Sequence, residues 1–134
     1  MNIKEQVYQA LSRSKKLTAL LAHDRRGRCI YPLRSPDAGS YPILVYSVIS
    51  DVPALMADGE ERERVVTVRI HILTKDGNFE SILREVQRAM VGIGFVRAQA
   101  TEFAEGQLFI MAIDYRTGIR GITEIVSHFV PSMK

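Results

Sequence analysis

Hydrophobic positions at the start of the chain recur with helical spacing. An apolar stripe predicts a helix from Asn2 to Ser12. Asn2 followed by Glu5 resembles a capping box, in which the first side chain accepts a backbone hydrogen bond. Ser14 is a candidate N-cap for a second short helix. The apolar stripes of the two helices consist of Ile3, Val7, Ala10 and Leu11, and of Leu17, Leu20 and Leu21.

Strand-like patterns dominate the rest of the chain. Ile43–Ile49 is rich in β-branched and aromatic residues, and 64–74 alternates between apolar and polar positions. Helical spacing returns over 79–90, and 95–103 with 107–117 predicts a hairpin. A short apolar run at 29–33 precedes these elements. The predicted order of elements is α-α-β-β-β-α-β-β.

The two strongest strands are separated by a charged segment, Ser50–Arg64, which we call the arm. Pro53 cannot donate a ladder hydrogen bond, and four carboxylates and two arginines crowd the last seven positions. Long connections inside a compact domain are uncommon and tend to be functional or mobile. We therefore expect a long charged loop that binds another protein and contacts it through the apolar residues Val52, Leu55 and Met56.

Length and composition indicate one soluble domain. The chain has 134 residues, of which 46% are hydrophobic and 25% charged, and we expect a single domain over 1–121. The segment 122–134 is expected to be a separate C-terminal element that could serve as a docking arm. Its helical spacing favours a helix and its β-branched content favours a strand, so both remain open. No apolar run approaches the roughly 20 residues that span a bilayer. The single Cys29 predicts a reducing compartment.

Positive charge is concentrated near the start of the chain. The net charge is +3, and the basic stretch is formed by Arg25, Arg26, Arg28 and Arg34. Such a stretch suits nucleic-acid phosphates, an acidic protein surface, or simple solvation. No aromatic residues interleave with these arginines, which disfavours a base-stacking platform.

Candidate catalytic chemistry is sparse. His23, His71 and His128 show no metal-ligand spacing, and no nucleophile or phosphate-binding motif is present. A spatial arrangement of Cys29, His71 and an aspartate remains open. The acidic residues Asp58, Glu60, Glu61 and Glu63 only partly match the pattern of a loop that binds a hard cation such as Ca²⁺. The interleaved Arg62 and Arg64 would partly neutralise such a site. We expect neither catalysis nor a cofactor or metal.

The order of elements resembles that of a known family. The sequence runs from the helix pair to Arg28-Cys29-Ile30-Tyr31-Pro32 and Tyr41-Pro42-Ile43-Leu44-Val45, then through the arm to the strand Val65–Thr74, a helix and a hairpin. This is similar to the tail completion (tail-to-head joining) proteins of long-tailed bacteriophages, which are related to tail terminators. The resemblance covers roughly residues 3–118.

The resemblance implies a structural protein without catalysis. It implies an α+β fold, with helices packed on a mostly antiparallel sheet, and a subunit that is often monomeric before it assembles into a hexameric ring. The implied partners are the head connector (head completion protein) and the tail tube proteins, with DNA passing through the ring without specific binding. The implied location is the head–tail interface of the virion, after the host cytoplasm.

A closed ring needs two different complementary patches on each subunit. We expect residues Asp51 to Arg64 of the arm and the loop Arg34–Tyr41 to be contact elements that become ordered only on assembly. We also expect the basic stretch to meet the acidic part of the arm. The alternative is a small nucleic-acid-binding module that uses the basic stretch. The candidate interface residues are Arg25, Arg26, Arg28, Arg34, Asp51, Leu55, Met56, Asp58, Glu60, Glu61 and Arg62.

Overall fold

The computed structural model describes residues 2–24, 27–33, 40–57 and 60–120. The side chains of Asp24, 27–28, 54–57, 60–63 and 118–120 lie outside that description. Most of the predicted loop Arg34–Tyr41 and the whole segment 122–134 also lie outside the described residues.

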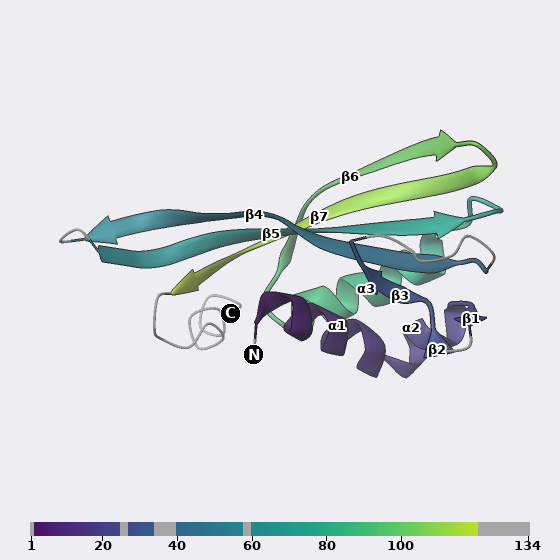
Figure 1. Ribbon diagram of the computed structural model, residues 1–134, viewed down its shortest axis with the longest axis horizontal. Helices are drawn as coiled ribbons and strands as arrows, with labels where there is room; N and C mark the ends of the chain where they lie inside the picture. Colours follow the sequence, from purple (N-terminus) through teal and green to yellow (C-terminus); the bar gives the residue numbers. More distant parts are fainter. Residues whose placement is uncertain (1, 25–26, 34–39, 58–59, 121–134) are drawn as a thin grey trace.

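A five-stranded sheet forms the centre of the fold (Figure 1). The first two strands in spatial order, β3 and β4, are parallel, and every other neighbouring pair is antiparallel. The prediction of an α+β fold with a mostly antiparallel sheet is therefore confirmed. In spatial order the strands are β3 (Ile30–Pro32), β4 (Ile43–Ala57), β5 (Glu60–Thr74), β7 (Leu108–Arg120) and β6 (Val96–Glu105).

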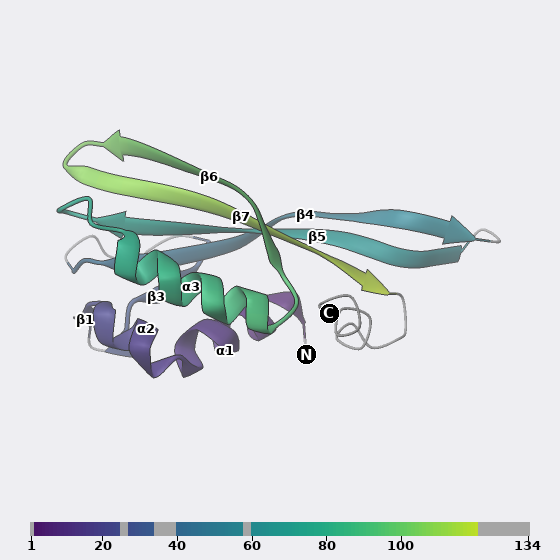
Figure 2. The same cartoon turned by 180° about the vertical axis from the view of Figure 1, so that it is seen from behind.

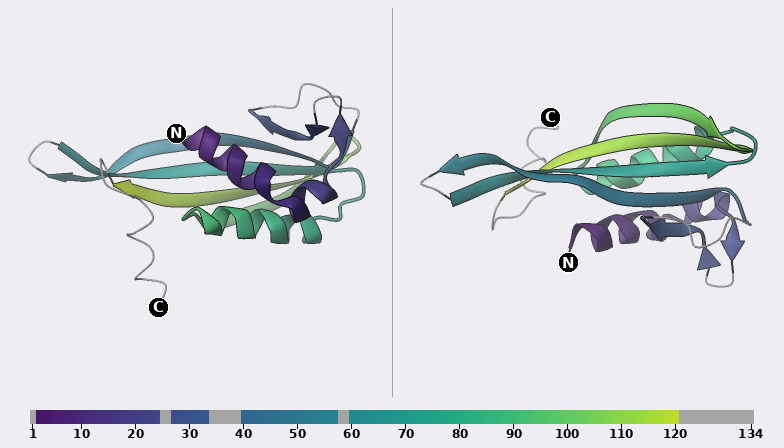
Figure 3. Two further views of the ribbon diagram at one scale, coloured as in Figure 1. Left: turned by 90° about the horizontal axis from the view of Figure 1, so that it is seen from below. Right: turned by 45° about the horizontal axis from the view of Figure 1, so that its top comes forward.

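Within the described residues, three helices lie against one face of this sheet (Figures 2 and 3). They are α1 (Ile3–Arg13), α2 (Lys15–Leu20) and α3 (Glu80–Gly92). The predicted caps are present: the Asn2 side chain accepts a hydrogen bond from the backbone N–H of Glu5, and the Ser14 side chain accepts one from Leu17. A separate antiparallel pair, β1 (His23–Asp24) and β2 (Gly27–Arg28), follows α2.

The core lies between the helices and the sheet. The predicted inward face of β5 is confirmed, because its four apolar residues are fully buried: Val66, Val68, Ile70 and Ile72. They join one cluster with Val86 and Met90 of α3 and with Val7 and Leu11 of α1. Burial of this apolar area is the main stabilising contribution to a fold of this size.

The structure corrects the expected backbone of the arm. In place of a long charged loop, β4 and β5 continue as paired antiparallel strands as far as Ala57 and Glu60. Pro53 lies in register with Arg64, and the register shifts directly after it. A local irregularity of this kind accommodates a residue that has no N–H to donate.

The last strand ends further along the chain than predicted, because β7 continues to Arg120. β7 lies between β5 and β6, and its residues Met111, Ile113 and Tyr115 are buried. Phe109, two residues before Met111 in the same strand, is 43% exposed. Gly118, one residue beyond the predicted hairpin arm 107–117, pairs with Val65 inside the sheet.

Candidate protein interface

The β4–β5 hairpin extends beyond the part of the sheet that the helices cover (Figure 1). Core burial in β4 ends near Val48, and the next described apolar side chains are open to solvent, with Ile49 43% and Val52 50% exposed. Exposed apolar side chains on a projecting element are typical of protein contact sites when they lie together. The structure thus presents the described part of the arm as a preformed β-hairpin.

Asp51 is engaged within this hairpin. Its Oδ1 atom lies 3.4 Å from Nε of Arg64 on the facing strand, and both side chains are about 40% exposed. The Nε atom of Arg64 is buried and makes no hydrogen bond, so the contact is a loose ion pair. Exposed pairs of this kind contribute about 0–1 kcal/mol. Asp51 therefore already has a cation on its own chain.

The other predicted arm residues are placed by their backbone. Leu55 and Met56 belong to β4, and Glu60, Glu61 and Arg62 belong to β5. Met56 is in register with Glu61 near the end of the hairpin. Their side chains and all of Asp58 lie outside the description.

The basic stretch belongs to a different part of the molecule. Arg28 lies in β2, whereas Arg25, Arg26 and Arg34 fall outside the described residues. The β1–β2 pair lies at the end of the long axis opposite the tip of the β4–β5 hairpin (Figures 1 and 3). The structure therefore does not bring Arg28 and the arm together within one subunit.

A row of polar side chains crosses the sheet on the face opposite the helices. Arg69 of β5 donates two hydrogen bonds to Asp114 of β7, with distances of 2.7 Å from Nε to Oδ1 and 3.0 Å from Nη2 to Oδ2. Gln99 of β6 donates a third, 2.9 Å, to Oδ2. Asp114 is only 6% exposed. The row ties three strands together through a carboxylate that would be costly to bury alone.

Ionisation of this row follows from its contacts. Hydrogen bonds from Arg69 hold the pKa of Asp114 below its ordinary value, although burial opposes them. The same hydrogen bond raises the pKa of Arg69. Burial lowers the pKa of the neighbouring His71, and the charge of Arg69 adds to that effect. At neutral pH the row is an ion pair beside a neutral imidazole.

The row was not recognised in the sequence. The alternation over 64–74 predicts that Arg69 and His71 share the polar face of this strand, whereas Asp114 is not among the candidate residues. Its signal was a single carboxylate inside the otherwise apolar run Ile110–Tyr115. Buried carboxylates are rare unless they are paired, so that position predicts a cation on a neighbouring strand.

Cys29, the thiol of the possible Cys–His–Asp arrangement, packs in an apolar cluster. Cys29 is 1% exposed and clusters with Ile43 and Val45. Asp114 is the aspartate that interacts electrostatically with His71. Its two carboxylate oxygens already accept hydrogen bonds from Arg69 and Gln99. A buried thiol in an apolar cluster behaves as a small hydrophobic side chain. Across the described ranges, no three His, Cys, Asp or Glu residues are grouped to hold a metal ion.

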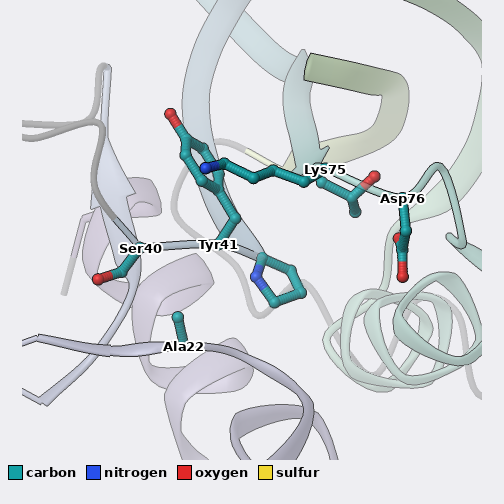
Figure 4. A pocket seen from close by; sticks show the side chains of 7 residues that line it. Ala22, Ser40, Tyr41, Lys75 and Asp76 are labelled. Carbon is teal, nitrogen blue, oxygen red and sulfur yellow. The ribbon is translucent and has the colours of Figure 1, made fainter. Parts of the chain in front are cut away.

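An open hollow of about 430 Å³ lies at the start of β4 (Figure 4). The Lys75 side chain extends over the ring of Tyr41, with Nζ 5.5 Å from the ring centroid. This contact ties the end of β5 to the residue before Pro42. The lining residues are Ala22, Ser40, Tyr41, Pro42, Thr74, Lys75 and Asp76.

None of the helices in the described ranges combines the length and apolar character needed to cross a bilayer.

Comparison with known proteins agrees with the fold. A chain in the solved structure of the virion of a native gene transfer agent particle is similar over 89% of this chain and 95% of that chain, with a TM-score of 0.65. The identity is 19%, so this similarity shows the fold alone. A comparison with curated proteins gives no match. The family model described as tail completion protein gp17 matches residues 5–120. The chain therefore belongs to the tail completion protein gp17 family.

Proposed function

We propose that this protein completes a phage tail and joins it to the head connector as a ring of identical subunits. The proposed ring has six subunits, the number that the family resemblance implies. Family membership assigns it a structural role in a phage tail. The connector, the tail tube and the ring are the proposed partners and assembly. The proposed location is the head–tail interface of the virion, reached from the host cytoplasm, and the role needs no catalytic group.

The projecting β4–β5 hairpin is the observation that supports this proposal best. It leaves the helix-covered body and exposes Ile49 and Val52. A scaffold that holds such an element away from its own core is suited to contact another subunit or a neighbouring ring. We therefore retain Asp51, Leu55 and Met56 as interface residues, together with Asp58, Glu60, Glu61 and Arg62.

The placement of the basic stretch agrees with a head-to-tail arrangement. A ring requires that two different surfaces of each subunit meet across every interface. Arg28 and the hairpin tip lie towards opposite ends of the long axis. We propose that Arg25, Arg26, Arg28 and Arg34 of one subunit face the acidic arm of the next. Such charges steer association and set register more than they add affinity.

A charge reversal in the arm tests the proposal. The variant Glu60→Lys with Glu61→Lys is expected to fold normally by circular dichroism but to fail in joining purified heads to tails. The control Glu5→Lys with Glu80→Lys changes the net charge equally on exposed helix positions and should join normally. Normal joining by the arm variant would remove the arm from the interface.

The charge pairing is tested separately. Adding Arg25→Glu and Arg26→Glu to the lysine variant should restore joining if the two regions face each other across subunits. Persistent failure of this combined variant, with its fold intact, would contradict the pairing. Duplex DNA binding that weakens steeply with salt would instead favour the alternative of a nucleic-acid-binding module.

A further inference from the structure

The two edges of the sheet differ in how they are protected. On one side, β3 covers β4 only from Leu44 to Tyr46. Beyond that point β4 carries Pro53 and three register shifts, which are features that discourage further strand pairing. Natural sheets use such irregularities to keep an edge from adding another chain.

β6, the opposite edge, has little of this protection (Figure 1). All ten of its residues are exposed, including Val96 at 62% and Phe103 at 43%. It contains no proline and no lysine, and its register with β7 is regular from Gln99 to Glu105 after one irregularity near its start. A long regular edge with apolar side chains is a template for another strand.

We propose that residues 122–130 of a second copy of this chain pair with β6 as an added strand. This inference rests on the proposed ring, because it names one contact between its subunits. The segment has the composition of a strand: β-branched Ile122, Thr123, Ile125, Val126 and Val130 with Phe129, and Glu124 as its one acidic residue. The family match ends at Arg120, so the segment lies outside the matched residues.

The lengths of donor and acceptor agree. At about 3.3 Å per residue, the nine residues 122–130 span roughly 30 Å, and the regular part of β6, Gln99–Glu105, needs roughly 23 Å. An apolar, low-charge segment of this kind gains hydrogen bonds and burial when it joins an edge. Because donor and acceptor are different surfaces, the contact is heterologous and can close a ring.

The geometry of β7 favours a second copy as the donor. β6 begins at Val96, opposite Arg116, and β7 continues four residues further to Arg120. The chain after Arg120 therefore starts past the beginning of β6. To pair with its own β6, the chain would have to reverse its direction and pass the connection from α3 to β6, in which Phe95 is buried.

Cysteine cross-linking in the full chain tests this contact. In a Cys29→Ala background, Phe103→Cys and Ile125→Cys are made in separate chains and mixed before tails are assembled. Oxidation is expected to give a disulfide-linked heterodimer. Replacing Phe103→Cys by Glu80→Cys, on the exposed face of α3, is expected to give none.

Amide exchange on the full chain is the second measurement. The amides of 99–105 should become at least ten-fold more protected as protein concentration rises, and Val126→Pro should abolish that gain. Met133→Pro is the matched control outside the paired segment. A cross-link that forms only within one chain carrying both cysteines would overturn the proposal, as would an absence of both cross-link and protection.

Failure of this contact can be told from failure of the proposed function. If tails containing these variants join heads normally but show no cross-link and no protection of β6, the strand addition is wrong and the joining role stands. If the wild-type chain neither assembles nor joins heads to tails, the proposed function itself is wrong.

Discussion

Arg69 on β5 and Asp114 on β7 lie opposite each other in the sheet register and share two hydrogen bonds of 2.7 and 3.0 Å. Charge-assisted bonds in this two-point geometry are the strongest class of side-chain hydrogen bond. With Gln99 as a third partner, Asp114 joins the last hairpin to the centre of the sheet.

Asp114→Asn is expected to lower the free energy of unfolding by about 1–3 kcal/mol, because one charge is lost and the Arg69 guanidinium loses its ionic partner. The figure lies below that for a fully buried pair because the Arg69 side chain is 36% exposed. Urea denaturation measures the change. Glu80→Gln removes the exposed Glu80–Arg84 pair at 3.4 Å and should change stability by no more than about 0.5 kcal/mol. Equal effects of the two substitutions would contradict this account.

Stability should fall in acid partly through the same residue. The pKa of Asp114 is lower in the folded protein than the ordinary value of 3.8. Its contribution is therefore complete above that value and is lost as the pH falls through the folded pKa. The urea midpoint of the wild type should drop more steeply below about pH 4 than that of Asp114→Asn. Parallel curves would show that Asp114 has no part in the acid dependence.

Tyr115 predicts an alkaline limit to stability. Burial raises its pKa to about 12, and its hydroxyl donates a 2.8 Å hydrogen bond to Oε1 of Gln87 on α3. Because the unfolded chain ionises near 10, this residue's contribution is complete below pH 10 and is lost as the pH rises towards 12. Tyr115→Phe should cost about 0.5–1.5 kcal/mol at pH 7 and flatten the alkaline decline.

The control for Tyr115 is Tyr8→Phe, since Tyr8 is 44% exposed. Thermal or urea unfolding between pH 8 and 11.5 measures both variants. A decline as steep in Tyr115→Phe as in the wild type would assign the alkaline limit to other groups.

Both helix caps should be measurable in the N-terminal part of the chain. Asn2→Ala and Ser14→Ala each remove an acceptor, at 2.8 and 3.2 Å from a backbone nitrogen, and should cost about 0.5–2 kcal/mol. Asn2→Asp and Ser14→Asp keep an acceptor and should retain most of the stability. An alanine variant as stable as its aspartate counterpart would show that the cap contributes nothing.

Two glycines should respond in opposite directions to alanine. Gly77 has a φ of +75°, and an added Cβ would lie 3.4 Å from the Phe109 ring, so Gly77→Ala should destabilise by about 1 kcal/mol or more. Gly92 ends α3 with nothing within 4 Å of an added Cβ, and Gly92→Ala should stabilise by about 0.4–1 kcal/mol. Changes of the same sign in the two melting temperatures would contradict this contrast.

The sequence predicted elements best where periodicity and burial coincide. The alternation of Val66 to Ile72 and the helix from Glu80 both appear in the structure as expected. The arm was misjudged because Pro53 and its charges are typical of a loop, whereas neighbouring β7 pairs with β5 as far as Glu63 and extends the sheet there. Long-range pairing of this kind overrides local residue preferences.

The candidate site was less predictable than the fold. The resemblance to the family follows from the order of elements, but an edge strand is defined only by which strands lie beside it. The exposure of β6 therefore depends on the spatial order β5-β7-β6. The same is true of Asp114, whose partner Arg69 is 45 residues away in sequence.

A hairpin that is already paired has a kinetic consequence for assembly. The β4–β5 backbone needs no folding step when it meets a partner, so encounter and docking can be nearly the same event. The chain then has no internal delay in this element. In the proposed joining role, the timing of assembly would therefore be set by the arrival of a finished tail or a filled head.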